Sequence, residues 1–312
     1  MIDFRYHLVS IVSIFLALAV GIVLGAGPLK EDLGNTLTSE VRNLRADKAT
    51  LRTQLDLAER GTQARDEFTT ASNRSLLASR LTDQTVAVLV LPGADAGLVK
   101  STTETLIAAG AKIGSSVQVQ DAWVDPEKAS FRSSLGQQLA SQVGVPLDAE
   151  GDVLDTVLAR SILTKAGSAS TGAAAALEVM RTGDLIKYSS EAVTPASVAV
   201  VVAGPVTGSD AAARTARATA LAQLAVAVDG AGAGAVLTGT SAVPGATNVT
   251  SVVTTVRDDN DMTDVLSTVD DGELPMGQAS VVFGILEQEA GKAGQYGLSG
   301  DATASFPQLA TK

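Results

Sequence analysis

The chain has 312 residues, 46% of them hydrophobic but only 3% aromatic, so a folded core has to be built mainly from Ala, Val and Leu. It contains no cysteine, which excludes disulfides, thiolate metal sites and cysteine nucleophiles. The net charge is −11, and residues 83–312 carry 13 basic and 25 acidic side chains, a net charge of −12. Because such a segment is repelled by nucleic acid and by anionic lipid, no nucleic-acid partner is expected.

The first element is an uncharged run from Leu8 to Leu29, LVSIVSIFLALAVGIVLGAGPL. At ~1.5 Å per residue it spans roughly 33 Å as a helix, enough to cross a ~30 Å hydrocarbon core. Residues 1–7 are expected to stay in the cytoplasm, as short N-termini normally do, which places the rest of the chain outside. A signal peptide cleaved near residues 25–27 is the alternative, although the apolar run exceeds the usual core of such peptides. We therefore expect a single-pass membrane protein.

Small residues recur at every fourth position of this run: Ser13, Ala17, Gly21 and Gly25. The Gly21-x-x-x-Gly25 spacing lets two membrane helices approach closely. Small residues are also common in membrane helices that make no such contact, and this is the alternative. A packing face formed by Ala17, Gly21 and Gly25 is the prediction.

Residues 31–82 are strongly charged, contain no proline and predict a helical stalk. Apolar residues follow a 4-3-7-4-3 spacing, which is a heptad seam, with one polar interruption that can fix register and helix number. The seam consists of Leu37, Val41, Leu44, Lys48, Leu51, Leu55 and Ala58. It weakens after Gly61, where ordinary helix or a hairpin is expected. A lone amphipathic helix lying on the head is the alternative to a coiled coil.

Residues 83–295 predict an α/β head with a Rossmann-like parallel sheet, either as one domain or as two half-domains in tandem. Two apolar runs, TVAVLVL from Thr85 and SVAVVVA from Ser197, are each followed by a Pro/Gly turn, a helix-like stretch and a second short apolar run. Such strand, helix, strand units, apolar on both strand faces, are typical of parallel sheets. Two or three helices are expected between the two units, a last helix near residues 281–289, and an irregular tail over 296–312.

Catalytic patterns are lacking in this head. The turns LPGADAG and AGPVTG miss the G-x-G-x-x-G fingerprint, and no phosphate-binding G-x-x-x-x-G-K-[ST] motif occurs. His7, at the membrane edge, is the only histidine, which excludes a Ser-His-Asp triad or a His-based metal site in the head. The acidic runs at 258–264 and 270–273 lack EF-hand spacing and are expected to be solvated loops. Three methionines are too scattered for a Cu(I) cluster, namely Met180, Met262 and Met276. We therefore expect no enzyme activity, no metal and no cofactor.

The opening MIDFRYHLVSIVSIFLALAVGIVLG and the segment KAGQYG, from Lys292 to Gly297, are distinctive. Together with the Leu-rich stalk between them, they resemble the actinobacterial MctB family over essentially the whole chain. The resemblance implies a copper-transport or channel-forming outer-membrane protein. For the closely similar SteB proteins, it implies a division-associated membrane partner of SteA that acts on the peptidoglycan hydrolase RipA.

The functions that the resemblance implies require different kinds of residue. A copper conduit should present Cys, His or Met ligands, and a membrane β-barrel should show alternating strands with aromatic girdles. A scaffold needs an anchor, a heptad stalk and a head without catalytic residues, which matches this sequence. The main hypothesis is therefore a non-enzymatic envelope scaffold. Its seam pairs with itself or with a SteA-like partner and docks the coiled coil of a peptidoglycan hydrolase. Copper transport or homeostasis is the alternative, and an enzyme acting on a nucleotide or sugar is a third possibility.

Overall fold

A computed structural model describes residues 4–26, 29–147, 151–165, 170–188, 193–241 and 245–308; of residue 26 and residues 29–35 it describes the backbone alone. The chain divides into two compact units, residues 1–65 and 66–312. The boundary falls inside the second helix, α2 (Leu29–Leu76).

The first helix, α1 (Phe4–Ala26), contains a stretch long and apolar enough to cross a membrane, Phe4–Gly25, with a mean hydropathy of 2.8. It begins earlier than predicted, because residues 4–7 are as compatible with helix as the apolar run that follows. Leu29, predicted to end the membrane segment, instead opens α2, and Pro28 lies outside the described residues.

α2 is one helix of 48 residues, about 72 Å at the usual rise per residue. It runs without a break through Gly61, where a hairpin was one expectation, because Leu, Arg, Ala, Gln and Glu sustain helix on both sides. Threonine hydroxyls bond back to the preceding turn, as when Thr50 Oγ1 donates to the Ala46 carbonyl at 3.0 Å. The helix ends at Leu76, earlier than the predicted stalk end at residue 82.

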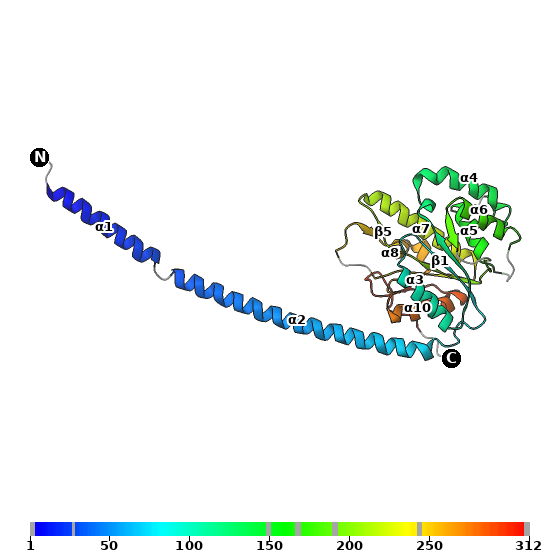
Figure 1. The fold of residues 1–312 in the computed structure, drawn as a ribbon, viewed down its shortest axis with the longest axis horizontal. Helices are drawn as coiled ribbons and strands as arrows, with labels where there is room; N and C mark the ends of the chain where they lie inside the picture. Colours follow the sequence, from blue (N-terminus) through cyan, green and yellow to red (C-terminus); the bar gives the residue numbers. More distant parts are fainter. Residues whose placement is uncertain are drawn as a thin grey trace. The chain divides into compact units, whose positions relative to one another are not determined.

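The second unit, drawn in Figure 1 as a sheet with helices around it, is built on one seven-stranded sheet. The strand order is β3-β2-β1-β4-β6-β8-β9. Neighbouring strands are parallel apart from the antiparallel pair β2 and β3. β1 pairs with both β2 and β4, so the two predicted βαβ halves share one sheet instead of forming tandem half-domains. The strands are β1 (Thr85–Val90), β2 (Lys112–Val119), β3 (Ile186–Tyr188), β4 (Val198–Val202), β6 (Ala235–Thr238), β8 (Ser267–Val269) and β9 (Gln295–Tyr296).

The strand order reverses beside β1, since β2 lies on one side of it and β4, β6, β8 and β9 follow on the other. This is the flavodoxin-like doubly wound arrangement, whose switch point lies between β1 and β4. Two short strands form a separate sheet: β5 (Val206–Thr207) and β7 (Val249–Thr250). In the sequence, β5 follows β4 and β7 follows β6.

Each central strand contributes to two cores, as the continuous apolar runs predicted. Val86 and Val88 pack into one cluster, whereas Ala87 and Leu89 pack into the other, because successive side chains point to opposite faces of a sheet. Residues of α3 (Ala96–Ala108) and α10 (Pro275–Glu289) complete the first cluster. The second cluster is completed by helices α4 (Ala129–Ala140), α5 (Val153–Ile162), α6 (Ala173–Thr182), α7 (Ala211–Ala231) and α8 (Val252–Arg257).

The end of α2 is anchored in the second unit. Leu77 and Leu81, just after the helix, are buried in the cluster with α3 and α10. Asn73 Nδ2 donates a hydrogen bond of 2.7 Å to the carbonyl of Pro275, the first residue of α10. The Arg80 guanidinium lies 5.7 Å from the centre of the Phe283 ring. The last turn of α2 and the residues that follow it are therefore packed into the second unit.

Candidate functional site

The predicted seam lies on one side of α2 and is open to solvent. Its five large apolar residues are all exposed: Leu37 by 60%, Val41 by 44%, Leu44 by 66%, Leu51 by 64% and Leu55 by 57%. Lys48 and Ala58 are exposed as well. The described side chains of the seam are therefore not buried within their own unit, and a lone amphipathic helix stays the alternative to a coiled coil. An apolar stripe along three heptads is the form of surface that a second helix covers.

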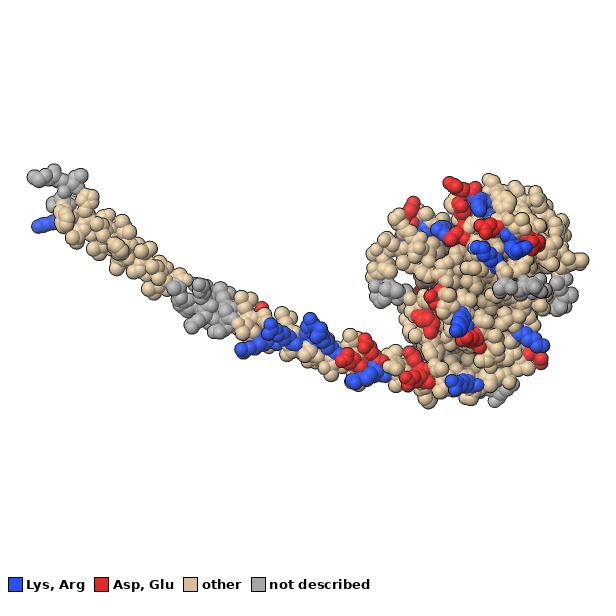
Figure 2. Space-filling view, in the orientation of Figure 1, with Lys and Arg blue, Asp and Glu red and all other residues tan. Residues whose placement is uncertain are grey.

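A shallow groove marks the centre of this seam. Leu44, Leu51 and Leu55 form its apolar floor, and Asp47 and Arg52 flank it. Figure 2 shows acidic and basic side chains interspersed along the described part of α2. The seam thus combines an apolar strip with flanking charges of both signs, which is the chemistry of a selective helix–helix contact rather than of a metal or substrate site.

The membrane-helix residues Ala17, Gly21 and Gly25 also lie on one described helix. A β-carbon built at Gly21 or Gly25 would meet nothing within 4 Å, so both positions are open to a neighbouring helix. Ser13, one turn earlier, satisfies its hydroxyl by donating to the Val9 carbonyl at 2.9 Å. No described part of the chain therefore covers Gly21 or Gly25, and the contact of this face with a second membrane helix stays a prediction.

The switch point of the sheet, where doubly wound folds bind ligands, is filled by its own loops. A β-carbon on Gly204, after β4, would lie 1.9 Å from the backbone of Gly93, after β1. Gly93 itself has a positive φ of +80° and would place a β-carbon 3.0 Å from the Pro205 carbonyl oxygen. These glycines serve loop packing, which agrees with their interpretation as turn residues.

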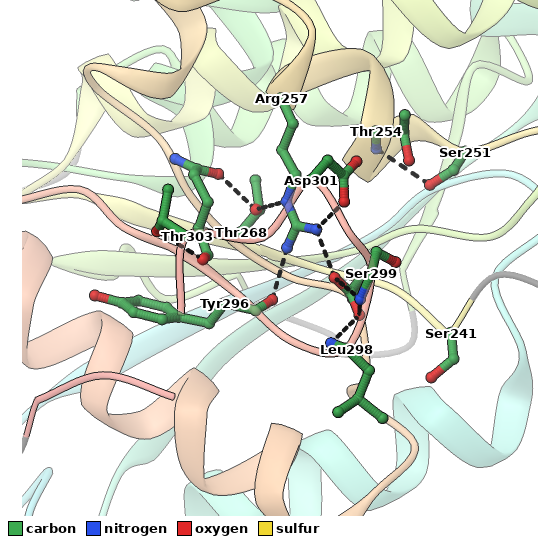
Figure 3. Close-up of polar contacts among 12 residues, drawn as sticks. Ser241, Ser251, Thr254, Arg257, Thr268, Tyr296, Leu298, Ser299, Asp301 and Thr303 are labelled. Atoms are coloured by element: carbon green, nitrogen blue, oxygen red, sulfur yellow. Dashed lines mark hydrogen bonds and ion pairs between the residues drawn. The ribbon is translucent and has the colours of Figure 1, made fainter. Parts of the chain in front are cut away.

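The acidic runs are not uniformly solvated, and the prediction was wrong for Asp270 and Asp271, which are 3% and 0% exposed. Arg257, at the end of α8, donates to Asp270 Oδ2 at 2.5 Å, to Asp301 Oδ1 at 2.8 Å and to the Tyr296 carbonyl (Figure 3). Asp270 Oδ1 also accepts from the backbone N–H of Leu298 at 2.8 Å. A buried arginine that neutralises the carboxylate explains how Asp270 tolerates burial.

The KAGQYG segment forms the last strand and the turn after it, not an irregular tail. Gln295 is buried and its amide donates to the Thr263 and Leu266 carbonyls, while the Tyr296 hydroxyl donates to Glu287. Gly297 has a φ of +136°, and a β-carbon there would lie 2.4 Å from the Asp270 carboxyl carbon. The structure therefore gives this distinctive motif a structural role: it fixes the chain end onto β8.

Three other carboxyl groups are perturbed by burial. Burial raises the pKa of Asp155 to about 7, a shift that nearby Asp152 increases and the 2.8 Å hydrogen bond from Trp123 Nε1 opposes. Burial also raises the pKa of Asp271 to about 7, with the Asp270 charge as the next cause, and that of Asp229 to about 6. They lie on separate elements, and Asp271 has no hydrogen-bond partner for its carboxylate oxygens within the described residues. They are not arranged as an acid–base pair.

The potential metal ligands are dispersed. Met180 is fully buried in the core and Met262 is half-buried, whereas Met276 lies in the first turn of α10. Within the described ranges, no group of three His, Cys, Asp or Glu side chains is placed to hold a metal ion.

Comparison with known proteins gives one consistent family. A family model described as "Copper transport outer membrane protein, MctB" matches residues 1–307. The copper transporters MctB of Mycobacterium tuberculosis and Mycobacterium bovis are each 27% identical over 308 residues, which cover 95% of this chain and 96% of the relative. The copper transporter MctB of Mycobacterium leprae is 26% identical over 323 residues, covering 99% of this chain and 100% of the relative. With an apolar N-terminal helix, a long second helix and an α/β head all inside the matched region, the chain belongs to the MctB family.

Proposed function

We propose that this protein is a non-enzymatic, membrane-anchored scaffold of the cell envelope, whose stalk pairs with the stalk of a second copy. The paired stalks then dock a SteA-like membrane partner and the coiled coil of a peptidoglycan hydrolase, as the resemblance to SteB-type proteins implies. The observation that carries the proposal is the seam of large apolar side chains that stays exposed over three heptads of α2.

The residue types along the seam favour two helices. With Leu37 at position d, Leu44 and Leu51 also occupy d, and Val41 and Leu55 occupy a. Leucine at d with a β-branched residue at a, as at Val41, favours two-stranded parallel coiled coils over larger bundles, whereas Leu55 at a does not add to this preference. Lys48 falls at an a position, where a single polar residue specifies register and helix number at some cost in stability.

The flanking charges favour a parallel pair in register. In this register Glu40 and Asp47 occupy g positions, and Arg45 and Arg52 occupy e positions five residues later. A g residue of one helix faces the following e residue of its partner, so these two pairs would each join an acid to a base, whereas the next pair sets Gln54 opposite Glu59. An antiparallel pairing would instead set e positions against e positions, which brings arginines together.

The anchor agrees with this arrangement. Two chains that enter the same membrane through α1 leave it on the same side, so their stalks run in the same direction. The small-residue spacing at Gly21 and Gly25 is suited to close contact between two such helices. On this view the N-terminus is cytoplasmic, and stalk and head lie outside.

Copper transport or homeostasis is the second candidate, and the names of the mycobacterial relatives are what favour it. The head offers few soft ligands, since the whole chain has one histidine, four methionines and no cysteine. A titration of the purified full chain with Cu(I) and Cu(II) separates the candidates. Stoichiometric, tight copper binding would reverse their order.

The scaffold proposal is tested by the double variant Leu44→Asp/Leu51→Asp in the full chain. It should lose co-purification with a second tagged copy and with the SteA-like and hydrolase partners, because buried aspartates at two d positions break the seam. Leu57→Asp is the matched control, since Leu57 is 66% exposed on the same helix but lies off the seam. If the double variant retains both its self-association and its partners, the proposal fails.

A further inference from the structure

An open cavity of about 690 Å³ lies in the head, outside the region that the stalk proposal uses. Part of its lining comes from the segments that directly follow two strands, residues 203–205 after β4 and residues 239–241 after β6. The N-terminal half of α7 and all but the end of α8 form the other sides. The volume lies within the usual range of roughly 300–1,000 Å³ for small-molecule sites.

This place agrees with the general rule for open α/β sheets, in which ligands bind outside the carboxyl ends of the strands. The usual position between β1 and β4 is occupied by the contact of Gly93 with Gly204. The cavity lies one strand further along, between the ends of β4 and β6. The glycine fingerprint belongs to dinucleotide sites at the switch point, so its absence does not argue against a different kind of ligand one strand further along.

Hydroxyl groups dominate the polar lining. Thr215 and Thr219 lie one turn apart on α7, Thr240 and Ser241 follow β6, and Thr254 lies on α8. Ser241 Oγ is buried and has no hydrogen-bond partner in the described part of the chain. Figure 3 shows that Ser241 lies apart from Arg257 and its hydrogen-bond partners. It also shows Ser251 accepting a hydrogen bond from the Thr254 backbone N–H. A buried hydroxyl without a partner is costly unless a ligand or water satisfies it.

The charge of the lining disfavours anions. Its charged members are Asp258 and Asp259, and none of the residues that line it is Lys, Arg or His. Asp259 already accepts from the backbone N–H groups of Asp261 and Met262 at the start of α9 (Asn260–Thr263). Phosphates and nucleotides would therefore meet negative charge without a counter-charge.

The apolar part of the lining is aliphatic apart from Met262. Val252 and Val253 are buried beneath the cavity, and Pro205 and Val249 form part of its rim. Hydroxyls both donate and accept hydrogen bonds, so they match ligand hydroxyls in either role. Aliphatic side chains fit the C–H faces of a sugar ring. We propose that this cavity binds a neutral saccharide.

The test uses the full chain in a detergent without a sugar headgroup, because a maltoside detergent would compete. N,N′-diacetylchitobiose and maltose are the neutral probes, and glucose 6-phosphate is the anionic one. Saturation-transfer NMR and calorimetric titration should detect at least one neutral disaccharide at millimolar concentration. Glucose 6-phosphate should bind more weakly than that disaccharide.

Removing two hydroxyls without changing side-chain shape, in Thr215→Val/Thr219→Val, should weaken binding by at least about fivefold. Thr103→Val makes the same change on α3, away from the cavity, and should leave binding unchanged. Thr240→Val, at an exposed position, gives a second variant if the double one does not fold. The proposal is overturned if neither neutral probe binds, if the variants bind as the unmodified protein does, or if the phosphate binds more tightly.

Discussion

The stalk and the C-terminal part of the head differ in which kinds of side chain they expose and which they bury. On α2 the large apolar residues of the seam stay exposed, whereas around β8 and β9 even the carboxyl groups of Asp270 and Asp271 are buried. Asp270 is supported by Arg257 and by the chain end that returns over it. The head therefore supplies the partners of Asp270 from within one chain, whereas the large apolar side chains of the described seam are not covered within their own unit.

This difference indicates where a partner acts. A protein rarely leaves a long apolar stripe in water unless another surface covers it. The stripe lies on a helix with flanking charges of both signs, and on the function proposed above the partner is another helix of matching charge pattern. Head stability and stalk association should consequently respond to different substitutions.

The largest effect is expected at Arg257, in the head. Arg257→Met leaves the Asp270 carboxylate buried without its counter-charge, which should lower the free energy of unfolding by roughly 3–5 kcal/mol. Arg217→Met is the matched control, because its ion pair with Asp121 is exposed and worth about 1 kcal/mol at most. Chemical unfolding followed by the fluorescence of Trp123 measures both. Equal losses would mean that the buried pair does not hold the chain end. Stalk association should be unaffected in either variant.

The next effect concerns pH and Asp155. Burial raises the pKa of Asp155 from its ordinary value of 3.8 to about 7, so the folded state keeps a proton that the unfolded chain loses. Stability therefore falls as pH rises between these values, by roughly 1–3 kcal/mol. Asp155→Asn should remove this loss. The free energy of unfolding of the variant, relative to that of the unmodified protein, should therefore rise with pH.

Trp123 reports directly on Asp155, because it is the only tryptophan and its Nε1 donates to the Asp155 carboxylate. Its fluorescence should titrate near neutral pH in the unmodified protein and not in Asp155→Asn. A titration that persists in the variant would assign the change to another group.

A smaller effect is expected at Lys48 in the seam. Lys48→Leu should tighten self-association by about tenfold, because a lysine at an a position lowers coiled-coil stability. The same variant should also form larger assemblies, since the polar residue no longer limits the number of helices. Analytical ultracentrifugation of the full chain in detergent measures both changes. Weaker association would place Lys48 outside the core of the contact.

The smallest effect is expected from the flanking charges. Glu40→Lys should weaken association by about two- to threefold at low salt, and adding Arg45→Glu should restore it by reversing the pair. The difference should vanish at high ionic strength, because exposed charges are screened. Failure of the reversal would exclude the parallel register.

Patterns that repeat locally were predictable from sequence. The apolar runs of β1 and β4 and the heptad spacing of α2 are visible in single segments, and the structure confirms the strands and a continuous helix. The burial of Asp270 was not predictable, because Asp-Asp-Gly-Glu resembles a solvated loop and its support comes from Arg257 and Asp301, both distant in sequence. The one available signal was that Arg257 is the only basic residue between Arg217 and Lys292. β9 was missed because two residues carry no periodicity.

The central claim, that two stalks pair in parallel and in register, is most directly tested by disulfide cross-linking, for which a chain without cysteine is well suited. Leu44→Cys, at a d position, should give a covalent dimer under mild oxidation in the membrane. Ala46→Cys, on the outer side of the same helix, should give little. A stalk that remains monomeric with Leu44→Cys, or that cross-links equally at both positions, would contradict the account.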